Sequence, residues 1–216
     1  ILAFWQFYDQ VIPYILENTF GLSTTTANAF MSVDNILGVL LLPFFGALSD
    51  KTHTRLGKRT PYILYGTLAA VVLMAVLAYF QNVKSLWGFI ISLMVLLVVM
   101  SVYRSPAVSY MPDVTEKPLR SKGNAVINLV GYIGGIFSTI VMMFMLKSET
   151  NAAGEKVYSS GQSFVPVFLI VAAFMLITVL VMVFTVNENK VLKQTNIQAD
   201  EPQEAAAGKK LPRDVF

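Results

Sequence analysis

Three ionisable residues lie inside long apolar stretches of this sequence. Asp9 and Asp34 interrupt the first and second stretches, and Arg104 lies near the end of the fourth. Ionisable groups at membrane depth are costly and typically serve a pathway for ions or solutes. An apolar environment favours the neutral form of a carboxyl group, and a nearby arginine favours the charged form. These opposing effects suit a group that takes up and releases protons, so we interpret the three residues as coupling residues.

Helical geometry places the two acids at similar depth. Asp9 would lie roughly 13 Å and Asp34 roughly 12 Å from one membrane face, and Arg104 roughly 9 Å from the other. Each residue also has a simpler interpretation. Asp9 could face an outer vestibule, Asp34 could bond another helix, and Arg104 could reach the lipid headgroups. The sequence leaves both interpretations open.

A second group of polar residues lies between the second and third apolar stretches. It consists of Gly46, Asp50, Arg55, Gly57, Lys58 and Arg59. A glycine lets a neighbouring helix approach closely, and a carboxylate at a helix end can bind another helix N-terminus or Arg55. We expect Gly57 to turn the loop and the last two cations to lie at the anionic lipid surface. We call this group the gating motif, after the role that a family resemblance implies for it, and an ordinary basic loop is the alternative.

The elements that position these residues follow from composition. Hydrophobic residues make up 55% of the 216 positions, and the mean hydropathy is +0.62. About 20 apolar helical residues cross the hydrocarbon core of a bilayer. Six stretches meet or nearly meet this length, at 1–18, 26–48, 61–80, 86–110, 123–146 and 164–186. We therefore predict an all-α membrane protein in which residues 1–186 form a bundle of six transmembrane helices.

Basic residues indicate the orientation of this bundle. Seven lie in or beside the loops around 49–60 and 111–122, and three lie in the loops of the opposite side. Positive residues concentrate on the cytoplasmic side, so both ends of the chain should be cytoplasmic. Residues 187–216 are charged and hold few large apolar side chains. We expect them to be solvated, as a linker or as a C-terminal tail.

Aromatic and amide side chains lie close to the coupling residues and could contact a solute. Aromatic rings can stack on apolar faces of a solute, such as those of the sugars that a family resemblance implies, and amides can bond its hydroxyl groups. The candidates are Trp5, Gln6, Tyr8, Asn35, Tyr103 and Asn128. The alternative for each is packing against lipid or another helix.

The gating motif, together with Thr52 and Pro61, resembles the loop between helices 2 and 3 of major facilitator superfamily transporters, in the branch that carries glycosides and sucrose. The segment RSPAVSYMPDVT, residues 104–115, resembles the end of helix 4 in glycoside-pentoside-hexuronide:cation symporters and sucrose transporters. The resemblance implies the N-terminal six-helix half of such a transporter, with 187–216 leading to a second six-helix half. It also implies alternating access, with the gating motif as a cytoplasmic latch.

The sequence departs from the sodium-coupled members of that branch. Gly38 and Leu42 stand where those members carry sodium-binding acids, and Arg104 stands where they carry a sugar-binding acid. The resemblance therefore favours proton-coupled symport of a sugar or glycoside. Three alternatives remain: an exporter of drugs or other small solutes, a membrane scaffold or channel, and an intramembrane protease using Asp9 and Asp34. The protease would need a GxGD motif, which the sequence lacks.

The absence of cysteine excludes disulfides, thiolate metal sites and thiol nucleophiles, and it is compatible with a bacterial inner membrane. The only histidine, His53, lies in the basic loop. We expect no enzyme activity, catalytic residue, metal site, cofactor or nucleic-acid partner. The expected partners are the lipid bilayer, a small sugar-like substrate, a proton and the second half of the transporter.

Overall fold

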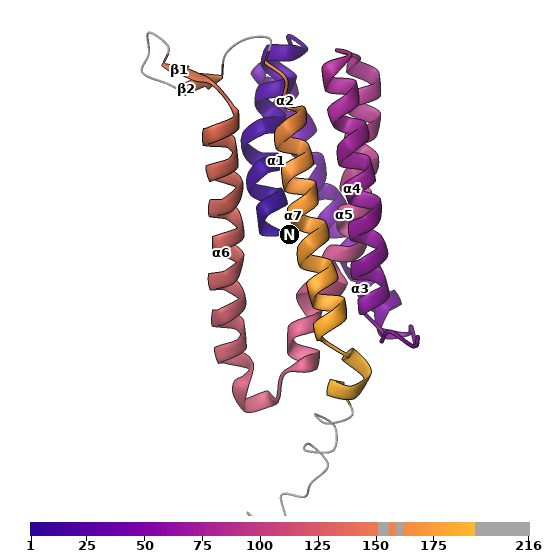
Figure 1. Ribbon diagram of the computed structural model, residues 1–216. Coiled ribbons are helices and arrows are strands. Elements are labelled where there is room, and N and C mark those ends of the chain that lie inside the picture. Colours follow the sequence, from indigo (N-terminus) through magenta and orange to yellow (C-terminus); the bar gives the residue numbers. More distant parts are fainter. Residues whose placement is uncertain (151–155, 159–161, 193–216) are drawn as a thin grey trace, which may run out of the picture.

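The computed structural model describes residues 1–150, 156–158 and 162–192, and most of them are helical. The helices are α1 (Leu2–Tyr14), α2 (Thr24–Met31), α3 (Val33–Asp50), α4 (Thr60–Asn82), α5 (Leu86–Val114), α6 (Arg120–Met145) and α7 (Val165–Thr185). A π-helical turn, Ile15–Thr19, continues α1, and a 3-10 turn, Lys117–Leu119, precedes α6. Figure 1 shows the long helices running side by side along one axis.

Five helical segments of the described chain are long and apolar enough to cross a membrane. They are Thr24–Asp50, Thr60–Asn82, Leu86–Val114, Arg120–Met145 and Val165–Thr185. The first consists of α2 and α3 in succession. α1 has only 13 residues, which is too short to span about 30 Å, although its π-helical turn lengthens it. The predicted all-α membrane fold is confirmed, with α1 as the short member of the bundle.

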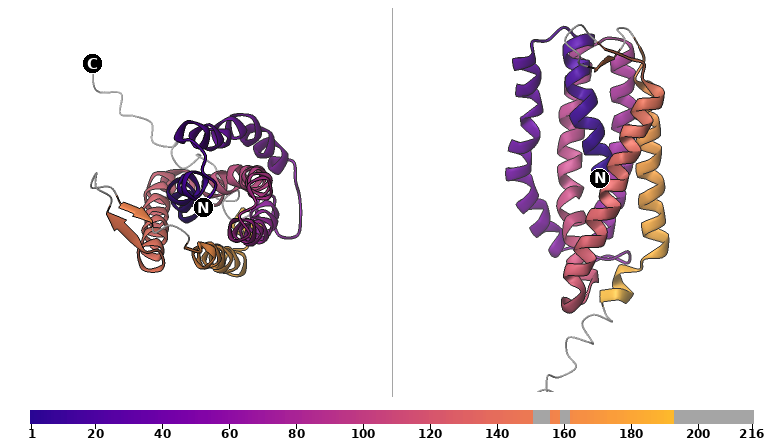
Figure 2. Two further views of the ribbon diagram at one scale, coloured as in Figure 1. Left: turned by 90° about the horizontal axis from the view of Figure 1, so that it is seen from above. Right: turned by 90° about the vertical axis from the view of Figure 1, so that its left-hand side faces the viewer.

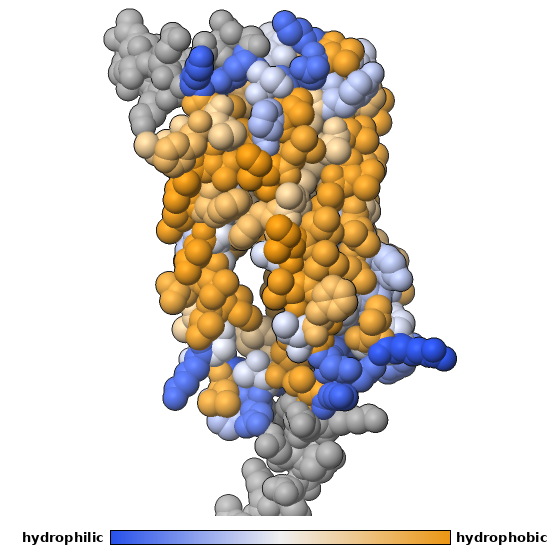
Figure 3. All heavy atoms as spheres, in the orientation of Figure 1, coloured by the Kyte–Doolittle hydropathy of each residue, from blue (hydrophilic) through white to orange (hydrophobic). Residues whose placement is uncertain are grey.

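The surface agrees with a membrane environment. Figure 3 shows a broad apolar band around the middle of the bundle and polar residues at both ends. Large apolar side chains are exposed on α3 and α6, including Val39, Phe44, Leu129, Met143 and Phe144. Exposed apolar surface of this extent is typical of contact with lipid or with another apolar surface.

α1 is deeply buried in the bundle. Val11, Ile15 and Leu16 have no exposed surface, and Phe7 contacts Phe168 of α7 with ring centroids 4.7 Å apart. Figure 2 shows α1 near the middle when the bundle is seen along its axis. Because α1 packs between α6 and α7, its polar residues can face groups on several helices.

The connection between α6 and α7 contains two short strands, β1 (Ser148–Thr150) and β2 (Lys156–Tyr158). They pair antiparallel, with Ser148 opposite Tyr158. The predicted all-α fold did not include these strands, because a three-residue strand is too short to show alternation in the sequence.

A side-chain hydrogen bond joins α6 to α1. The hydroxyl of Ser138 donates to the carbonyl oxygen of Ala3 at 2.6 Å, and Ser138 is fully buried. Thr139, the next residue, donates instead to the Gly135 carbonyl of its own helix at 3.3 Å. Only the first of these hydrogen bonds holds two helices together.

We expect Ser138→Ala to lower the stability of the bundle, because it leaves a buried α1–α6 contact without its hydrogen bond. The loss should be about 1 kcal/mol. Thermal unfolding of the full-length protein in detergent measures it, with Thr139→Ala as the matched control. Equal melting temperatures for the two variants would contradict the role of Ser138.

Candidate functional site

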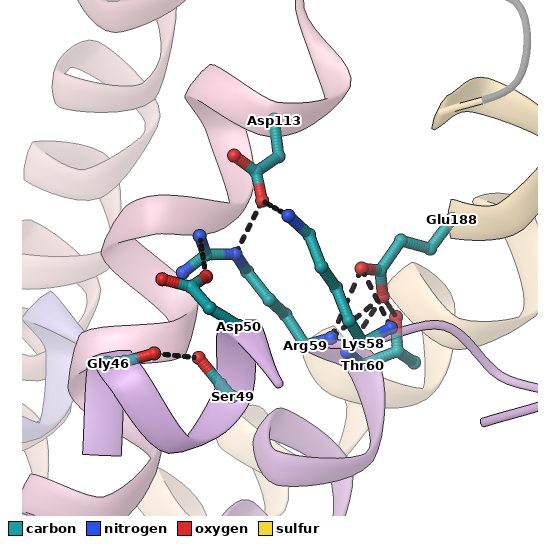
Figure 4. A network of polar contacts seen from close by, with 8 residues as sticks. All are labelled: Gly46, Ser49, Asp50, Lys58, Arg59, Thr60, Asp113 and Glu188. Atoms are coloured by element: carbon teal, nitrogen blue, oxygen red, sulfur yellow. Dashed lines mark hydrogen bonds and ion pairs between the residues drawn. The ribbon is translucent and has the colours of Figure 1, made fainter. Parts of the chain in front are cut away.

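Charged side chains gather at the end of the bundle where α3 and α5 end and α4 begins (Figure 4). We call Asp50, Lys58, Arg59, Asp113 and Glu188 the ion-pair cluster. They come from the end of α3, the loop before α4, the end of α5 and the segment after α7. The cluster therefore connects the region between α3 and α4 with the ends of α5 and α7, which are distant from it in sequence.

Glu188 caps the beginning of α4. Its Oε1 atom accepts from the backbone N–H groups of Lys58 and Arg59, each at 3.1 Å. Its Oε2 atom accepts from the backbone N–H of Thr60 at 2.9 Å and from the Thr60 hydroxyl at 2.7 Å. The first N–H groups of a helix have no acceptor within the helix and carry partial positive charge. A fully buried carboxylate there satisfies these groups and ties the segment after α7 to α4.

Gly57 makes room for this carboxylate. Its φ of +120° lies in a region that other residues rarely adopt. A Cβ atom at this position would also overlap the carboxylate of Glu188. Gly57 therefore turns the loop, as predicted, and also lets Glu188 reach the backbone.

Arg59 bridges the ends of two helices. Its Nη2 atom donates to Oδ1 of Asp50 at 2.7 Å, and its Nε atom donates to Oδ2 of Asp113 at 2.6 Å. Lys58 Nζ lies 2.7 Å from the same Asp113 oxygen. The Arg59 side chain is 7% exposed and the Asp50 side chain 56%. Asp50, at the α3 end of the bridge, is therefore open to solvent, whereas the Arg59 side chain in the middle of the bridge is buried.

These contacts differ from those expected within the gating motif. Arg55 is exposed, and in the described part of the chain Asp50 pairs with Arg59 instead. Lys58 and Arg59 turn toward Asp113 rather than extending to the lipid surface. The reason is that the α4 N-terminus, held by Glu188, places the two cations between the acids.

Gly46 permits close contact between α3 and α5, as its position in the motif predicted. A Cβ atom there would lie 2.8 Å from the hydroxyl oxygen of Ser105 on α5. Ser49, one turn further on, is fully buried and donates its hydroxyl to the Gly46 carbonyl at 2.8 Å. This close packing brings Asp50 to the end of α5.

The segment after α7 also differs from expectation. Residues 187–216 were expected to be solvated, yet Glu188 is buried and Asn189 donates to the backbone carbonyl of Arg55 at 2.9 Å. A short helical turn covers 188–192. The rest of the expected linker, 193–216, lies outside the described residues.

A second group of polar residues lies within the apolar band. We call Trp5, Tyr8, Asp9, Asp34 and Arg104 the intramembrane cluster. The guanidinium carbon of Arg104 lies 4.7 Å from the ring centroid of Trp5, and Trp5 contacts Tyr8 edge to face at 5.5 Å. Asp9 and Asp34 are close enough to interact electrostatically with each other and with Tyr8. The fold thus brings together all three coupling candidates and two of the substrate candidates.

The other substrate candidates lie apart from one another. Gln6 lies beside Gly135 of α6, and Asn35 and Asn128 are exposed on α3 and α6. Tyr103 is 1% exposed, faces Gly66 of α4 and donates its hydroxyl to Met100 Sδ at 3.1 Å. Tyr103 therefore contributes to packing between α4 and α5.

Two members of the ion-pair cluster received no role from the sequence. Asp113 lies within the segment that resembles symporters, and Glu188 lies within the charged residues 187–216. The sequence could have indicated a role for both residues, because each acid lies at the end of an apolar span or directly after it. Acids at that position are candidates for pairing with the basic loops on the same side.

Apolar helices long enough to cross a bilayer, joined at one end by buried ion pairs, define an α-helical, multi-pass integral membrane protein. The chain belongs to the Major Facilitator Superfamily, whose family model matches residues 1–215. No solved structure matches the chain.

Its curated relatives include transporters for several solutes. An alpha-ketoglutarate permease from Escherichia coli is 33% identical over 48% of this chain and 23% of its own length. An isoprimeverose transporter from Lactiplantibacillus pentosus is 27% identical over 61% of this chain and 28% of its own length. A sucrose transport protein from Arabidopsis thaliana is 26% identical over 57% of this chain and 24% of its own length. The matches thus span about a quarter of each relative.

Gly57→Ala should destabilise the protein more than Gly21→Ala does. Both glycines have positive φ, but no atom lies within 4 Å of a Cβ built at Gly21, whereas Glu188 occupies that space at Gly57. Backbone strain alone costs of the order of 1–2 kcal/mol, and Gly57→Ala adds the displacement of Glu188. Thermal unfolding of the two variants measures the difference, and equal losses would contradict the contact with Glu188.

Proposed function

We propose that this chain is the N-terminal half of a secondary active transporter that carries a sugar or glycoside by alternating access, coupled to protons. Membership of the Major Facilitator Superfamily supports transport. Relatives named for isoprimeverose and sucrose transport support a sugar-like substrate. Relatives named proton-associated sugar transporters, from human and mouse, support the proton as coupling ion.

The observation that carries the proposal is the bridge from Arg59 to Asp50 and Asp113. Alternating access needs helix ends that separate and rejoin during each cycle. Ion pairs open to solvent contribute about 0–1 kcal/mol each, so they can break without a large barrier. The pair with Asp50 meets this condition, because more than half of the Asp50 side chain is exposed.

Glu188 has a different part in this mechanism. Its carboxylate is buried and bound by several backbone N–H groups, so releasing it would leave an unpaired buried charge. Breaking such a contact is strongly destabilising. The loop and α4 would therefore move together with the end of α7, while the solvent-exposed contact to Asp50 opens and closes.

Proton coupling is assigned to Asp9 and Asp34. The two acids lie within the apolar band on different helices, Asp9 on α1 and Asp34 on α3. Carboxyl groups in apolar surroundings can bind a proton and release it when the surroundings change. Tyr8 is buried beside the two acids and would complete the coupling site. Trp5 contacts Tyr8, and Arg104 in turn lies against Trp5.

The orientation follows from the basic loops. The ion-pair cluster lies at the end that carries Lys51, Arg55 and Arg120, so it would face the cytoplasm of a bacterial cell. The substrate would bind between this bundle and a second six-helix half. The candidates for contacting the substrate at that interface are the polar groups of the intramembrane cluster and the exposed amides of Asn35 and Asn128.

We expect Asp50→Asn to slow transport several-fold while leaving membrane insertion intact. The amide keeps the shape of the side chain but removes the charge that attracts Arg59. Counterflow in proteoliposomes containing the full-length protein measures the rate. Lys51→Gln is the matched control, since Lys51 is exposed and makes no ion pair among the described residues. A wild-type rate for Asp50→Asn would show that the bridge is not a latch.

Asp9→Asn and Asp34→Asn should separate coupling from substrate movement. Each amide removes a titratable proton with little change in volume. At least one variant should lose accumulation of substrate driven by a pH gradient and still exchange substrate across the membrane. Glu17→Gln, on the π-helical turn that continues α1, is the control. If both amide variants still accumulate substrate against its gradient, the coupling site lies elsewhere.

A further inference from the structure

α4 ends in an unusual cap, at the hairpin that joins it to α5. The backbone N–H of Lys84 donates to the carbonyl oxygen of Gln81 at 3.2 Å, and the N–H of Ser85 donates to that of Phe80 at 3.1 Å. These two hydrogen bonds form a Schellman motif, whose left-handed residue is usually glycine. Lys84 occupies this position with a φ of +56°, and no other non-glycine residue of the described chain has a positive φ. Because glycine would adopt this conformation without strain, the lysine side chain calls for an explanation.

The charge of Lys84 is isolated from the other charges of the chain. Lys84 is exposed, and it is the only lysine, arginine, histidine or acidic residue in 60–103. Every ion pair among the described residues belongs to the ion-pair cluster, at the opposite end of α4 and α5. Figure 1 shows the hairpin at the end of the bundle far from the segment that follows α7. The ammonium group of Lys84 is therefore available to an anion outside the described chain.

Two aromatic residues flank this lysine in the sequence, and both side chains are exposed. Tyr79 is 62% exposed and Trp87 is 74% exposed. Tyr79 lies about 5 Å along the axis before the last residue of α4, and Trp87 is the second residue of α5. Phe80, in contrast, packs between the two helices, since a Cβ atom at Gly88 would overlap its ring. This close contact fixes the hairpin and leaves the other two aromatic rings on its outer surface.

We propose that the α4–α5 hairpin binds the headgroup phosphate of an anionic phospholipid in the leaflet at this end of the bundle. Tyr79 and Trp87 lie where the apolar band meets the polar end, and tyrosine and tryptophan are favoured at that boundary of a bilayer. Lys84 lies just beyond the helix, from where a long basic side chain reaches the headgroups. A phosphate diester with one net charge balances one ammonium group, whereas phosphatidylcholine adds a cation of its own. The inference is independent of which solute is transported.

A lysine at the end of a helix also interacts favourably with the helix dipole. That contribution stabilises the protein whether or not a lipid is bound, and it does not depend on the charge of the headgroup. A lipid site, in contrast, should lose its preference for anionic headgroups when the ammonium group is removed. The two explanations therefore predict different lipid dependence for the same substitution at Lys84.

Trp87 can report on the lipid beside it. Phospholipids with brominated acyl chains quench tryptophan emission on contact. The emission of the full-length protein minus that of its Trp87→Phe variant isolates Trp87, and a titration in mixed detergent micelles measures the relative affinity of this site for each lipid. Phosphatidylglycerol and phosphatidylcholine with the same brominated chains are the matched probes. Inorganic phosphate, added at constant ionic strength, tests whether the site takes a free anion instead of a lipid.

Two substitutions remove the charge in different ways. Lys84→Gln retains the left-handed conformation at a non-glycine residue, whereas Lys84→Gly also removes its strain and should fold at least as well as the wild type. The matched control is Lys147→Gln, because Lys147 is an exposed lysine at the same end of the bundle, directly after α6. Thermal unfolding verifies that each variant folds, and Lys84→Gly replaces Lys84→Gln if the latter does not.

We expect the site to bind phosphatidylglycerol about fivefold more tightly than phosphatidylcholine, which corresponds to about 1 kcal/mol for one lysine near an anionic surface. Both Lys84 variants should lose this preference, and Lys147→Gln should keep it. Equal affinity of the wild type for the two lipids, or an unchanged preference in the Lys84 variants, would overturn the site. Loss of the preference in Lys147→Gln as well would indicate a general attraction of anionic lipid and would also overturn it. Displacement of phosphatidylglycerol by inorganic phosphate would overturn the assignment to a lipid.

Discussion

A buried carboxylate at the beginning of α4 sets the position of the charges around it. Glu188 accepts hydrogen bonds from three successive backbone N–H groups, and the last of them belongs to Thr60. Because these contacts fix where α4 starts, the side chain of Arg59 emerges between Asp50 and Asp113. Without the capping carboxylate, the three buried N–H groups would have to find other acceptors, and the position of Arg59 between the two acids would no longer be fixed. The ends of α3, α5 and α7 thus depend on one contact.

The two polar clusters differ in how completely their groups are satisfied. In the ion-pair cluster each buried charge has a partner of opposite sign or several hydrogen bonds. In the intramembrane cluster, Trp5 and Tyr8 have buried polar atoms without partners among the described residues, and Arg104 lies against the Trp5 ring and forms no ion pair in that part of the chain. Satisfied charges hold a structure in one state, whereas unsatisfied donors provide binding energy for a ligand. The contrast fits a closed end and a binding region within the same bundle.

The position of the intramembrane cluster depends on how the other helices pack against α1. α1 is short and deeply buried, and α6 reaches it through the bond from Ser138 to Ala3. α5 approaches from the other side and brings Arg104 to Trp5. Close approach at Gly46 brings α3 to α5 at Ser105, the residue next to Arg104. Small side chains and one buried hydroxyl therefore allow polar groups on separate helices to meet within lipid.

The amino-acid sequence by itself determined the membrane fold, because runs of about 20 apolar residues have no other stable arrangement than helices across a bilayer. It also indicated the gating motif and the three ionisable residues within the spans, since charges in apolar surroundings stand out by type alone. The tertiary structure decided which charges pair. The sequence offered Arg55 or a neighbouring helix N-terminus as the partner of Asp50, whereas the structure pairs it with Arg59. This pairing depends on Glu188, which lies 129 positions after Arg59. Local spacing carries no information about such a contact, because the path of the loop follows from how α7 packs against α4.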